Sequence, residues 1–200
     1  MTTVDKGAKV STSGKAITSV KIVVAGGFGV GKTTFVGAVS DIQPLSTEAV
    51  MTTASNSHDD IARVPLKSTT TVAMDFGRVE LEDDLLLYLF GTPGQERFWF
   101  MWDNLVRGAI GAVVLVDSRR LADSFTPIDF FENRRIPYVV AVNLFDGIRH
   151  HPLENVRRAL ALDRSIPMFA CDARNRGEVK QTLLSLLEYV MAQVSEPALT

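Results

Sequence analysis

The stretch that most constrains the fold is Val20–Thr34, which reads VKIVVAGGFGVGKTT. Its β-branched residues predict a buried strand, its glycines a tight loop, and its last residues the start of a helix. The pattern G-x-x-x-x-G-K-T runs from Gly26 to Thr33 and is typical of a loop that binds phosphate. Because a strand precedes the loop and a helix follows it, a glycine-rich turn with a chance lysine is the weaker interpretation.

Each part of this loop has a chemical role. Glycines let successive backbone N–H groups converge on a phosphate, and the following helix turns the positive end of its dipole toward the anion. Lys32 can reach the β and γ phosphates, and the hydroxyl of Thr33 can coordinate Mg²⁺. The expected phosphate site is one continuous run of residues: Gly26, Gly27, Phe28, Gly29, Val30, Gly31, Lys32, Thr33 and Thr34.

Composition excludes several classes of function. The chain has 200 residues, of which 46% are hydrophobic and 22% are charged, so it predicts one globular domain. A net charge of −2 gives no field for nucleic acid or for an anionic membrane surface. The single cysteine, Cys171, excludes an intrachain disulfide and suits a reducing compartment. Without a membrane span or a cysteine for prenylation, we expect a cytoplasmic protein that reaches membranes only through partners.

The chain divides into a domain and two tails. Residues 1–19 are rich in Thr, Ser, Gly and Lys and predict a mobile tail, residues 20–195 a single domain, and residues 196–200 a short C-terminal tail. The stretch from Asp41 to Lys67 has no strand period. Its one candidate element is a helix around Thr47–Thr53.

The remaining sequence alternates strand and helix. Thr71–Leu81 and Leu85–Phe90 predict a hairpin across a short polar connection. The expected strands that follow are Ala109–Val116, Tyr138–Val142 and Met168–Ala170, and the expected helices are Leu121–Asn133, Pro152–Leu160 and Glu178–Val194. The pattern predicts an α/β three-layer sandwich of the P-loop NTPase class, with a six-stranded, mostly parallel sheet that contains one antiparallel strand. Ligands bind beyond the carboxyl ends of such strands.

A second motif follows the strand that ends near Phe90, where the chain reads FGTPGQERF. The N–H of Gly94 can meet a γ phosphate, and Gln95 can orient a water for hydrolysis. Here the chain resembles the Ras-like small GTPases, whose corresponding stretch reads Asp-Thr-Ala-Gly-Gln-Glu. The resemblance covers Val20 to about Val194 and implies a G domain that binds GTP or GDP with Mg²⁺.

Two further stretches resemble the guanine-binding loops of that family. VVAVNLFD ends in Asn143 and Asp146, similar to Asn-Lys-x-Asp, and its carboxylate can accept from N1–H and the 2-amino group of guanine. Adenine has no hydrogens at those edges, so such a site selects GTP over ATP. The run Asp172, Ala173 and Arg174 is similar to the Ser-Ala-Lys loop, which gives a backbone N–H to guanine O6.

The stretch TTTVAMDF, from Thr69 to Phe76, resembles switch I of Rab-type proteins. By that alignment Thr71 gives its hydroxyl to Mg²⁺ and its N–H to the γ phosphate, with Thr70 and a plain Thr-rich strand as the alternatives. The resemblance thus implies Lys32, Thr71 and Gln95 as catalytic residues, and Thr33 and Thr71 as metal ligands.

The switch Gly-x-Pro-Gly-Gln, with no leading aspartate, is similar to that of bacterial MglA-type GTPases and of GTPases encoded in actinobacterial conservons. The latter group implies roadblock/LC7-type and sensor-kinase-like partners. The implied function is a GTP-binding switch with slow hydrolysis. The alternatives are a GTP-binding scaffold with negligible hydrolysis and an ATP-using P-loop kinase.

Three positions depart from the family pattern. Gly91 stands where the family has an aspartate that holds Mg²⁺ through water, and Asp75 or Asp117 could substitute for it. Phe28 replaces a glycine beside the γ phosphate, so its ring predicts slow hydrolysis. Leu144 replaces a lysine that packs along the P-loop and the base, which predicts a loss of affinity more than of selectivity.

Five large apolar residues, FWFMW from Phe98 to Trp102, follow the second motif. On a helix Phe98, Met101 and Trp102 share one face, which leaves Trp99 and Phe100 turned elsewhere. Because one core cannot receive all five, we expect at least one to meet a partner or to cover switch I.

Overall fold

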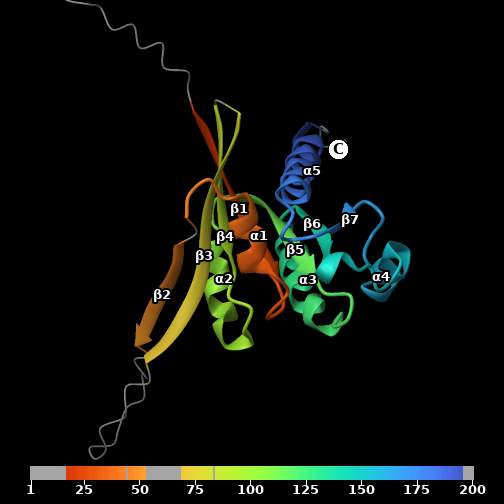
Figure 1. Cartoon of the computed structure of the whole chain (residues 1–200), viewed down its shortest axis with the longest axis horizontal. Helices are drawn as coiled ribbons and strands as arrows, with labels where there is room; N and C mark the ends of the chain where they lie inside the picture. Colours follow the sequence, from red (N-terminus) through yellow and green to blue (C-terminus); the bar gives the residue numbers. More distant parts are fainter. Residues whose placement is uncertain (1–16, 44, 53–68, 83, 196–200) are drawn as a thin grey trace, which may run out of the picture.

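The centre of the sheet is strand β1, Thr18–Gly26, whose residues from Ile22 to Ala25 are fully buried. Such burial of consecutive residues requires helices on both faces of the sheet. The computed structural model describes residues 17–43, 45–52, 69–82 and 84–195, and the structural statements below refer to these residues (Figure 1).

The elements alternate along most of the chain. The strands after β1 are β2 Leu45–Thr52, β3 Thr69–Glu82, β4 Leu85–Gly91, β5 Ala109–Val116, β6 Tyr138–Asn143 and β7 Met168–Cys171. The helices are α1 Lys32–Val39, α2 Trp102–Leu105, α3 Ala122–Arg134, α4 Leu153–Ala159 and α5 Arg176–Ser195, with 3₁₀ turns η1 Glu96–Met101 and η2 Phe145–Gly147.

The sheet has the order β2-β3-β4-β1-β5-β6-β7. β3 pairs antiparallel with both β2 and β4, and the other pairs are parallel, so β3 alone runs against the rest. The expected fold class, a mostly parallel sheet with one antiparallel strand between helices, is confirmed. The structure adds a seventh strand, β2, at one edge (Figure 1).

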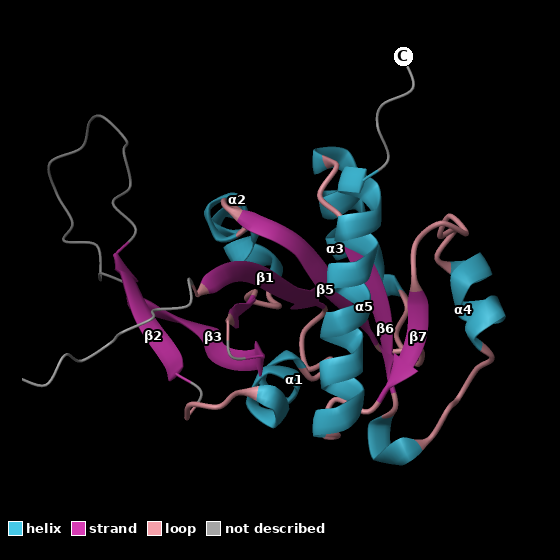
Figure 2. Cartoon of the chain, turned by 90° about the horizontal axis from the view of Figure 1, so that it is seen from above, coloured by secondary structure: helices cyan, strands magenta, loops and turns pink. Residues whose placement is uncertain are grey.

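Two apolar cores separate the three layers. Ile22 and Val24 of β1 point into one core, which α1 and α5 cover. Val23 and Ala25 point into the other, which receives Trp102 of α2 and the apolar face of α3. Figure 2 shows α1 and α2 on opposite sides of the sheet. The alternation of side chains along β1 therefore fixes both layers.

Two sequence predictions are corrected. The segment expected as a helix around Thr47–Thr53 forms β2 instead, because it pairs residue by residue with β3. Pairing with a neighbouring strand outweighs local helix propensity. β1 begins at Thr18, inside the expected tail. Residues 1–16, 53–68 and 196–200, which include most of both expected tails, lie outside the described residues.

The aromatic run forms the 3₁₀ turn η1 and the start of α2 rather than one helix, and Trp99, which was expected to face away from the core, packs against it. Phe98 and Trp102 are buried, Trp99 is half-buried against the core, and Phe100 stays 59% exposed. Within the described ranges, no helix has both the length and the apolar character needed to cross a bilayer.

Candidate functional site

The loop between β1 and α1 turns sharply at Gly31, whose φ is +105°. A Cβ at this position would lie 2.7 Å from the side-chain nitrogen of Asn143. The position therefore requires glycine for two reasons, its backbone conformation and the close approach of a neighbouring strand. This turn places the first N–H groups of α1 at the carboxyl edge of the sheet, where an anion can accept from them.

Lys32 lies at the floor of this loop and is only 8% exposed. Its Nζ donates to the carbonyl oxygens of Gly26 at 2.9 Å and Gly27 at 2.7 Å. Burial lowers the pKa of Lys32 to about 8, while the charge of Asp75 acts in the opposite direction. Gly94 is packed against it, since a Cβ on Gly94 would lie 2.7 Å from Nζ. The fold thus brings together Lys32 and Gly94, which are both predicted to bind phosphate.

A carboxylate lies beside Thr33, although the chain has none at position 91. The Thr33 hydroxyl donates to Oδ2 of Asp75 at 2.7 Å, and Asp75 is 8% exposed. Asp75 on β3 pairs directly with Gly91 on β4, and a Cβ on Gly91 would lie 3.0 Å from Oδ2 of Asp75. The carboxylate thus stands one strand away from its place in the family pattern, and the glycine makes room for it.

The hydroxyl of Thr92 is a third oxygen near this point. Thr92 is 2% exposed, and its Oγ1 finds no hydrogen-bond partner among the described residues. Thr33, Asp75 and Thr92 line the same cavity. Hydroxyl and carboxylate oxygens are the donors that Mg²⁺ prefers, and a buried hydroxyl without a partner has a free lone pair for a metal-bound water. The residues present therefore fit Mg²⁺.

Asn143, at the end of β6, joins two loops. Its Nδ2 donates to the carbonyl of Val30 at 2.9 Å, and its Oδ1 accepts from the N–H of Ala173 at 3.1 Å. Asn143 is buried, so both bonds are shielded from water. It therefore fixes the phosphate loop against the loop that follows β7.

Asp146 has a left-handed backbone, with φ 55°, and its side chain is 83% exposed. Its Oδ1 accepts from Nη1 of Arg174 at 3.1 Å. Arg174 also binds Asp172 through Nε at 3.0 Å and Nη2 at 2.8 Å, which lowers the pKa of Asp172. One arginine therefore holds two acids of neighbouring loops in place, and the expected base-binding residues lie together.

Two adjoining cavities connect these groups. One, of about 330 Å³, is lined by Phe28, the start of α1, Asp75 and the segment from Thr92 to Gly94. The other, of about 160 Å³, is lined by the loops at residues 143–146 and 172–174. Both include Gly29, Gly31 and Thr34. The arrangement suits an elongated ligand with an anionic end and a polar ring.

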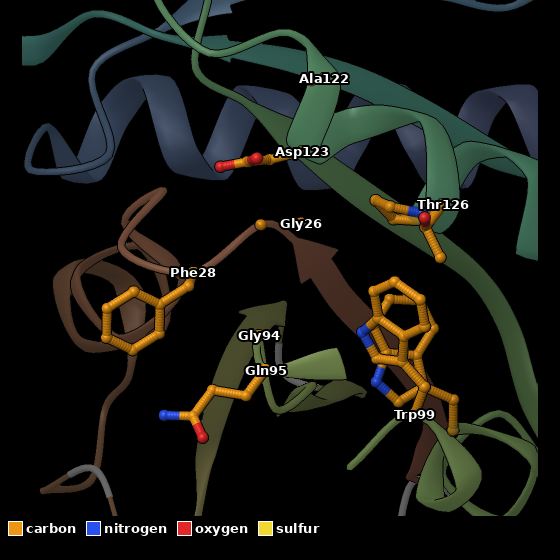
Figure 3. A pocket seen from close by; sticks show the side chains of 11 residues that line it. Gly26, Phe28, Gly94, Gln95, Trp99, Ala122, Asp123 and Thr126 are labelled. Atoms are coloured by element: carbon orange, nitrogen blue, oxygen red, sulfur yellow. The ribbon is translucent and has the colours of Figure 1, made fainter. Parts of the chain in front are cut away.

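Gln95 lies on the other side of the phosphate loop. It lines a pocket of about 410 Å³ together with Phe28, Trp99 and Asp123. Figure 3 shows the Gln95 side chain extending to the side on which Phe28 stands, with Trp99 on the other side. The predicted glutamine is therefore next to the phosphate loop, but it does not line the cavity that contains Lys32.

Thr71, a predicted metal ligand, lies apart from Thr33 and Asp75. It lies in β3 opposite Val50 of β2, four residues before Asp75. At about 3.3 Å per residue, its backbone is about 13 Å along the strand from Asp75. A contact with phosphate or Mg²⁺ would require the start of β3 to move.

Sequence comparison identifies relatives of this chain. It is 33% identical over 129 residues to the uncharacterized protein MJ1339 of Methanocaldococcus jannaschii. The aligned region covers 64% of this chain and 71% of that protein. This chain is 27% identical over 128 residues to the Ras-related protein RABD1 of Arabidopsis thaliana. Here the aligned region covers 58% of this chain and 62% of that protein.

Solved structures share the fold. The G-domain of FeoB from Methanococcus jannaschii matches with a TM-score of 0.57 and 13% identity, over 88% of this chain and 99% of that one. The cytosolic domain of the T. maritima FeoB iron transporter matches with a TM-score of 0.60 and 17% identity, over 88% of this chain and 65% of that one.

The profile of one protein family, described as conserved hypothetical ATP binding protein, matches residues 24–193. This range contains the phosphate loop, Gln95 and both loops of the expected base site. The chain therefore has the P-loop fold of a G domain and belongs to the family of conserved hypothetical ATP binding proteins.

Proposed function

We propose that the protein binds guanine nucleotides with Mg²⁺ and hydrolyses GTP. The observation that supports this most strongly is the pair of adjoining cavities, one beside a buried ammonium and one beside an exposed carboxylate. A polyphosphate fits the first and a purine the second. The similarity to a Ras-related protein, and to a FeoB domain solved in a GDP form, agrees with this choice.

Guanine rather than adenine follows from the chemistry of the base site. Asp146 and Asp172 are acceptors only, and Arg174 keeps both oriented. Guanine offers N1–H and a 2-amino group to such a carboxylate, whereas adenine presents an unprotonated N1. The family description names ATP, so the choice of base is the first point to test. Competition of GTP and ATP against fluorescent N-methylanthraniloyl-GDP tests it, and equal affinities would exclude the guanine assignment.

In this proposal Lys32 and the N–H groups of the loop neutralise the phosphates, and Thr33 with Asp75 holds the magnesium ion. When bound, Mg²⁺ supplies a positive charge that offsets the charge developing on the phosphate oxygens. The N–H of Gly94, a residue packed beside Lys32, would donate to the γ phosphate. Gln95 would orient the attacking water once its side chain has turned past Phe28, which lines both the Gln95 pocket and the phosphate cavity.

The position of the magnesium carboxylate gives a prediction. Asp75→Ala is expected to raise the Mg²⁺ concentration needed for tight GDP binding by about tenfold, in the range seen when groups behind a metal ligand are removed. Gly91→Asp alone places a side chain against Asp75 and should not improve Mg²⁺ affinity. The double variant returns one carboxylate to β4 and is expected to recover most of the loss. Titration of Mg²⁺ against fluorescent GDP measures all three, and a double variant as weak as Asp75→Ala would contradict the assignment.

The hydrolysis step gives another prediction. Gln95→Ala is expected to lower the single-turnover rate of GTP hydrolysis by at least about tenfold while GTP affinity stays within twofold, because the glutamine acts on the water. Phe28→Gly is expected to raise the wild-type rate, since it removes the ring beside Gln95. Rates that do not change in Gln95→Ala would favour the alternative of a GTP-binding scaffold without useful hydrolysis.

Switching follows from the place of Thr71. For Thr71 to reach the γ phosphate, the first part of β3 must leave its pairing with β2, so GTP and GDP would favour different arrangements of this edge. Phe28 and Phe100 stay exposed near the two switches and offer apolar contacts to a partner. We propose that a partner of the roadblock/LC7 type, which the sequence resemblance implies, binds one of these two arrangements of β2 and β3 more tightly than the other.

A further inference from the structure

The loop between β5 and α3 contains a charged group that the proposed mechanism does not use. It consists of Asp117, Arg119 and Arg120, which we call the arginine clamp. Asp117 is 3% exposed at the end of β5. Its carboxylate accepts from the backbone N–H of Arg119 at 3.0 Å, from Nε at 2.9 Å and from Nη2 at 2.8 Å. These bonds to Arg119 lower the pKa of Asp117, so the anchor stays ionised.

The side chain of Arg119, one arm of the clamp, reaches the loop after β6 that carries Asp146, which we call the base loop. The guanidinium carbon of Arg119 lies 3.9 Å from the centre of the Phe145 ring. Phe145 is the residue before Asp146 and lines the smaller cavity. A planar guanidinium that is fixed at two points by Asp117 and stacked on this ring limits the movement of the loop that carries Asp146.

The other arm reaches the phosphate loop. Nη2 of Arg120 donates to the carbonyl of Phe28 at 2.8 Å and lies 3.7 Å from where a Cβ on Gly29 would stand. The same guanidinium is 3.6 Å from carboxylate oxygens of both Asp117 and Asp123. Arg120 therefore holds the part of the loop that lines the phosphate cavity.

We propose that the arginine clamp positions the phosphate loop and the base loop relative to each other and so sets how long a nucleotide stays bound. This rests on the proposed function. The sequence has Leu144 where the resembled family has a lysine that packs along the P-loop and the base, and a leucine cannot donate to a loop carbonyl. In this chain two arginines from the loop after β5 make these contacts: Arg119 with the base loop and Arg120 with the phosphate loop.

Two carboxylates balance the charges of the clamp. Asp117 contacts both guanidinium groups and Asp123 contacts that of Arg120, so the clamp holds the loops without adding net charge beside the phosphate loop. Asp117, and to a lesser degree Asp146, raise the pKa of Arg119, so the arm stays charged in the presence of the base loop.

Removing each arginine of the clamp is expected to lower nucleotide affinity in a different way. Arg119→Ala frees the base loop and is expected to weaken GMP and GDP by the same factor, about tenfold. Arg120→Ala frees the phosphate loop and is expected to weaken GDP about tenfold while GMP, which has no β phosphate, changes less than twofold. Arg119→Lys keeps the charge but loses the fork and the planar stack, so it should resemble Arg119→Ala. Dissociation rates of N-methylanthraniloyl-GDP and calorimetric titration with GMP, both with Mg²⁺, measure these effects.

Arg134→Ala is the matched control. Arg134 also stacks on a phenylalanine, Phe130 at 3.8 Å, and also binds a carboxylate, Asp103 at 2.6 Å, at the far end of α3. If the clamp variants change nucleotide binding no more than Arg134→Ala does, the proposal is wrong. It is also wrong if both arms weaken GMP and GDP alike in proportion to a lower melting temperature.

Hydrogen exchange of the nucleotide-free protein separates this proposal from the proposed function. Peptides that cover residues 28–31 are expected to exchange faster in Arg120→Ala, and those that cover 144–147 faster in Arg119→Ala, with no change in Arg134→Ala. Faster exchange in a protein without guanine preference would overturn the proposed function and support the clamp. Unchanged exchange would overturn the clamp alone.

Discussion

Lys32→Met is expected to abolish nucleotide binding and, at the same time, to raise the melting temperature of the nucleotide-free protein. Burial lowers the pKa of Lys32 from 10.5 to about 8, so holding the charge there costs about 3 kcal/mol relative to water. A methionine of similar length removes that cost but leaves two loop carbonyls to water. The net gain is expected to be about 1 to 2 kcal/mol, or a few degrees. Nucleotide affinity should fall at least about a hundredfold.

The pH dependence of both effects has a definite sign. Between pH 8 and 10.5 the unfolded chain binds a proton at Lys32 that the folded chain has lost, so wild-type stability rises with pH in that window. The gain in the free energy of unfolding of Lys32→Met over the wild type is therefore largest below pH 8 and falls to zero toward pH 10.5. Bound phosphate keeps Lys32 protonated, so wild-type affinity should be level below about pH 7 and fall above 8.

Calorimetric melting and titration with GDP from pH 6.5 to 9.5 measure these two quantities. Lys21→Met, in the half-buried part of β1 and away from the phosphate loop, is the control for loss of a lysine elsewhere. A Lys32→Met protein that melts lower than wild type at pH 7 would show that the ammonium stabilises the loop rather than straining it. Retained GDP affinity would remove Lys32 from the binding site.

The inner strands could be predicted from sequence alone, and the edge strand could not. Ala109–Val116 was expected as a strand and has these bounds as β5, because helices cover both faces and leave a continuous apolar run. The signal for β2 lies in its register with β3, not in its own residues. Local periodicity carries no information about a partner strand that lies across a long connection.

The sequence predicts that the phosphate loop, Asn143 and Asp146 lie at the carboxyl edge of the sheet, because each directly follows or precedes an element with a clear pattern, and the structure has them there. For the missing aspartate the sequence offers Asp75 only as one of two substitutes. Counting back from the pair Glu82–Leu85 beside the hairpin turn sets Phe76, not Asp75, opposite Gly91, and Asp75 takes that place only because the register shifts between Glu80 and Glu82. A slip of one residue sends every side chain to the other face, and nothing in the sequence marks this irregularity.

The arginine clamp has no local signal either. Two consecutive arginines after a strand are typical of a solvated surface, and both side chains are in fact nearly half exposed. Their contacts are with Phe145 and Phe28, residues far away in the sequence. Only the packing of β5 between β1 and β6 brings these three loops together. Function that depends on contacts among loops therefore becomes visible only in the folded chain.

Asp146→Asn is expected to reverse the choice of base. The wild-type carboxylate only accepts, which matches the N1–H and 2-amino group of guanine. An asparagine amide places a donor there, which faces the 2-amino group unfavourably and suits the 2-oxo group of xanthine. Because a site built around hydrogen bonds rejects an analogue that leaves them unmade, GTP affinity should fall at least about a hundredfold, and XTP affinity should rise.

Competition of GTP, XTP and ATP against a fluorescent nucleotide measures this reversal. Asp103→Asn is the matched control, since Asp103 is also an exposed acid bound by one arginine but lies away from the base cavity. In Asp146→Asn the bond from Arg174 can still reach the amide oxygen, so the loop is expected to keep its shape and the change to be one of selectivity. A variant that loses all nucleotides equally would indicate a collapsed loop. One that binds ATP as before would place adenine, as the family description has it, in this site.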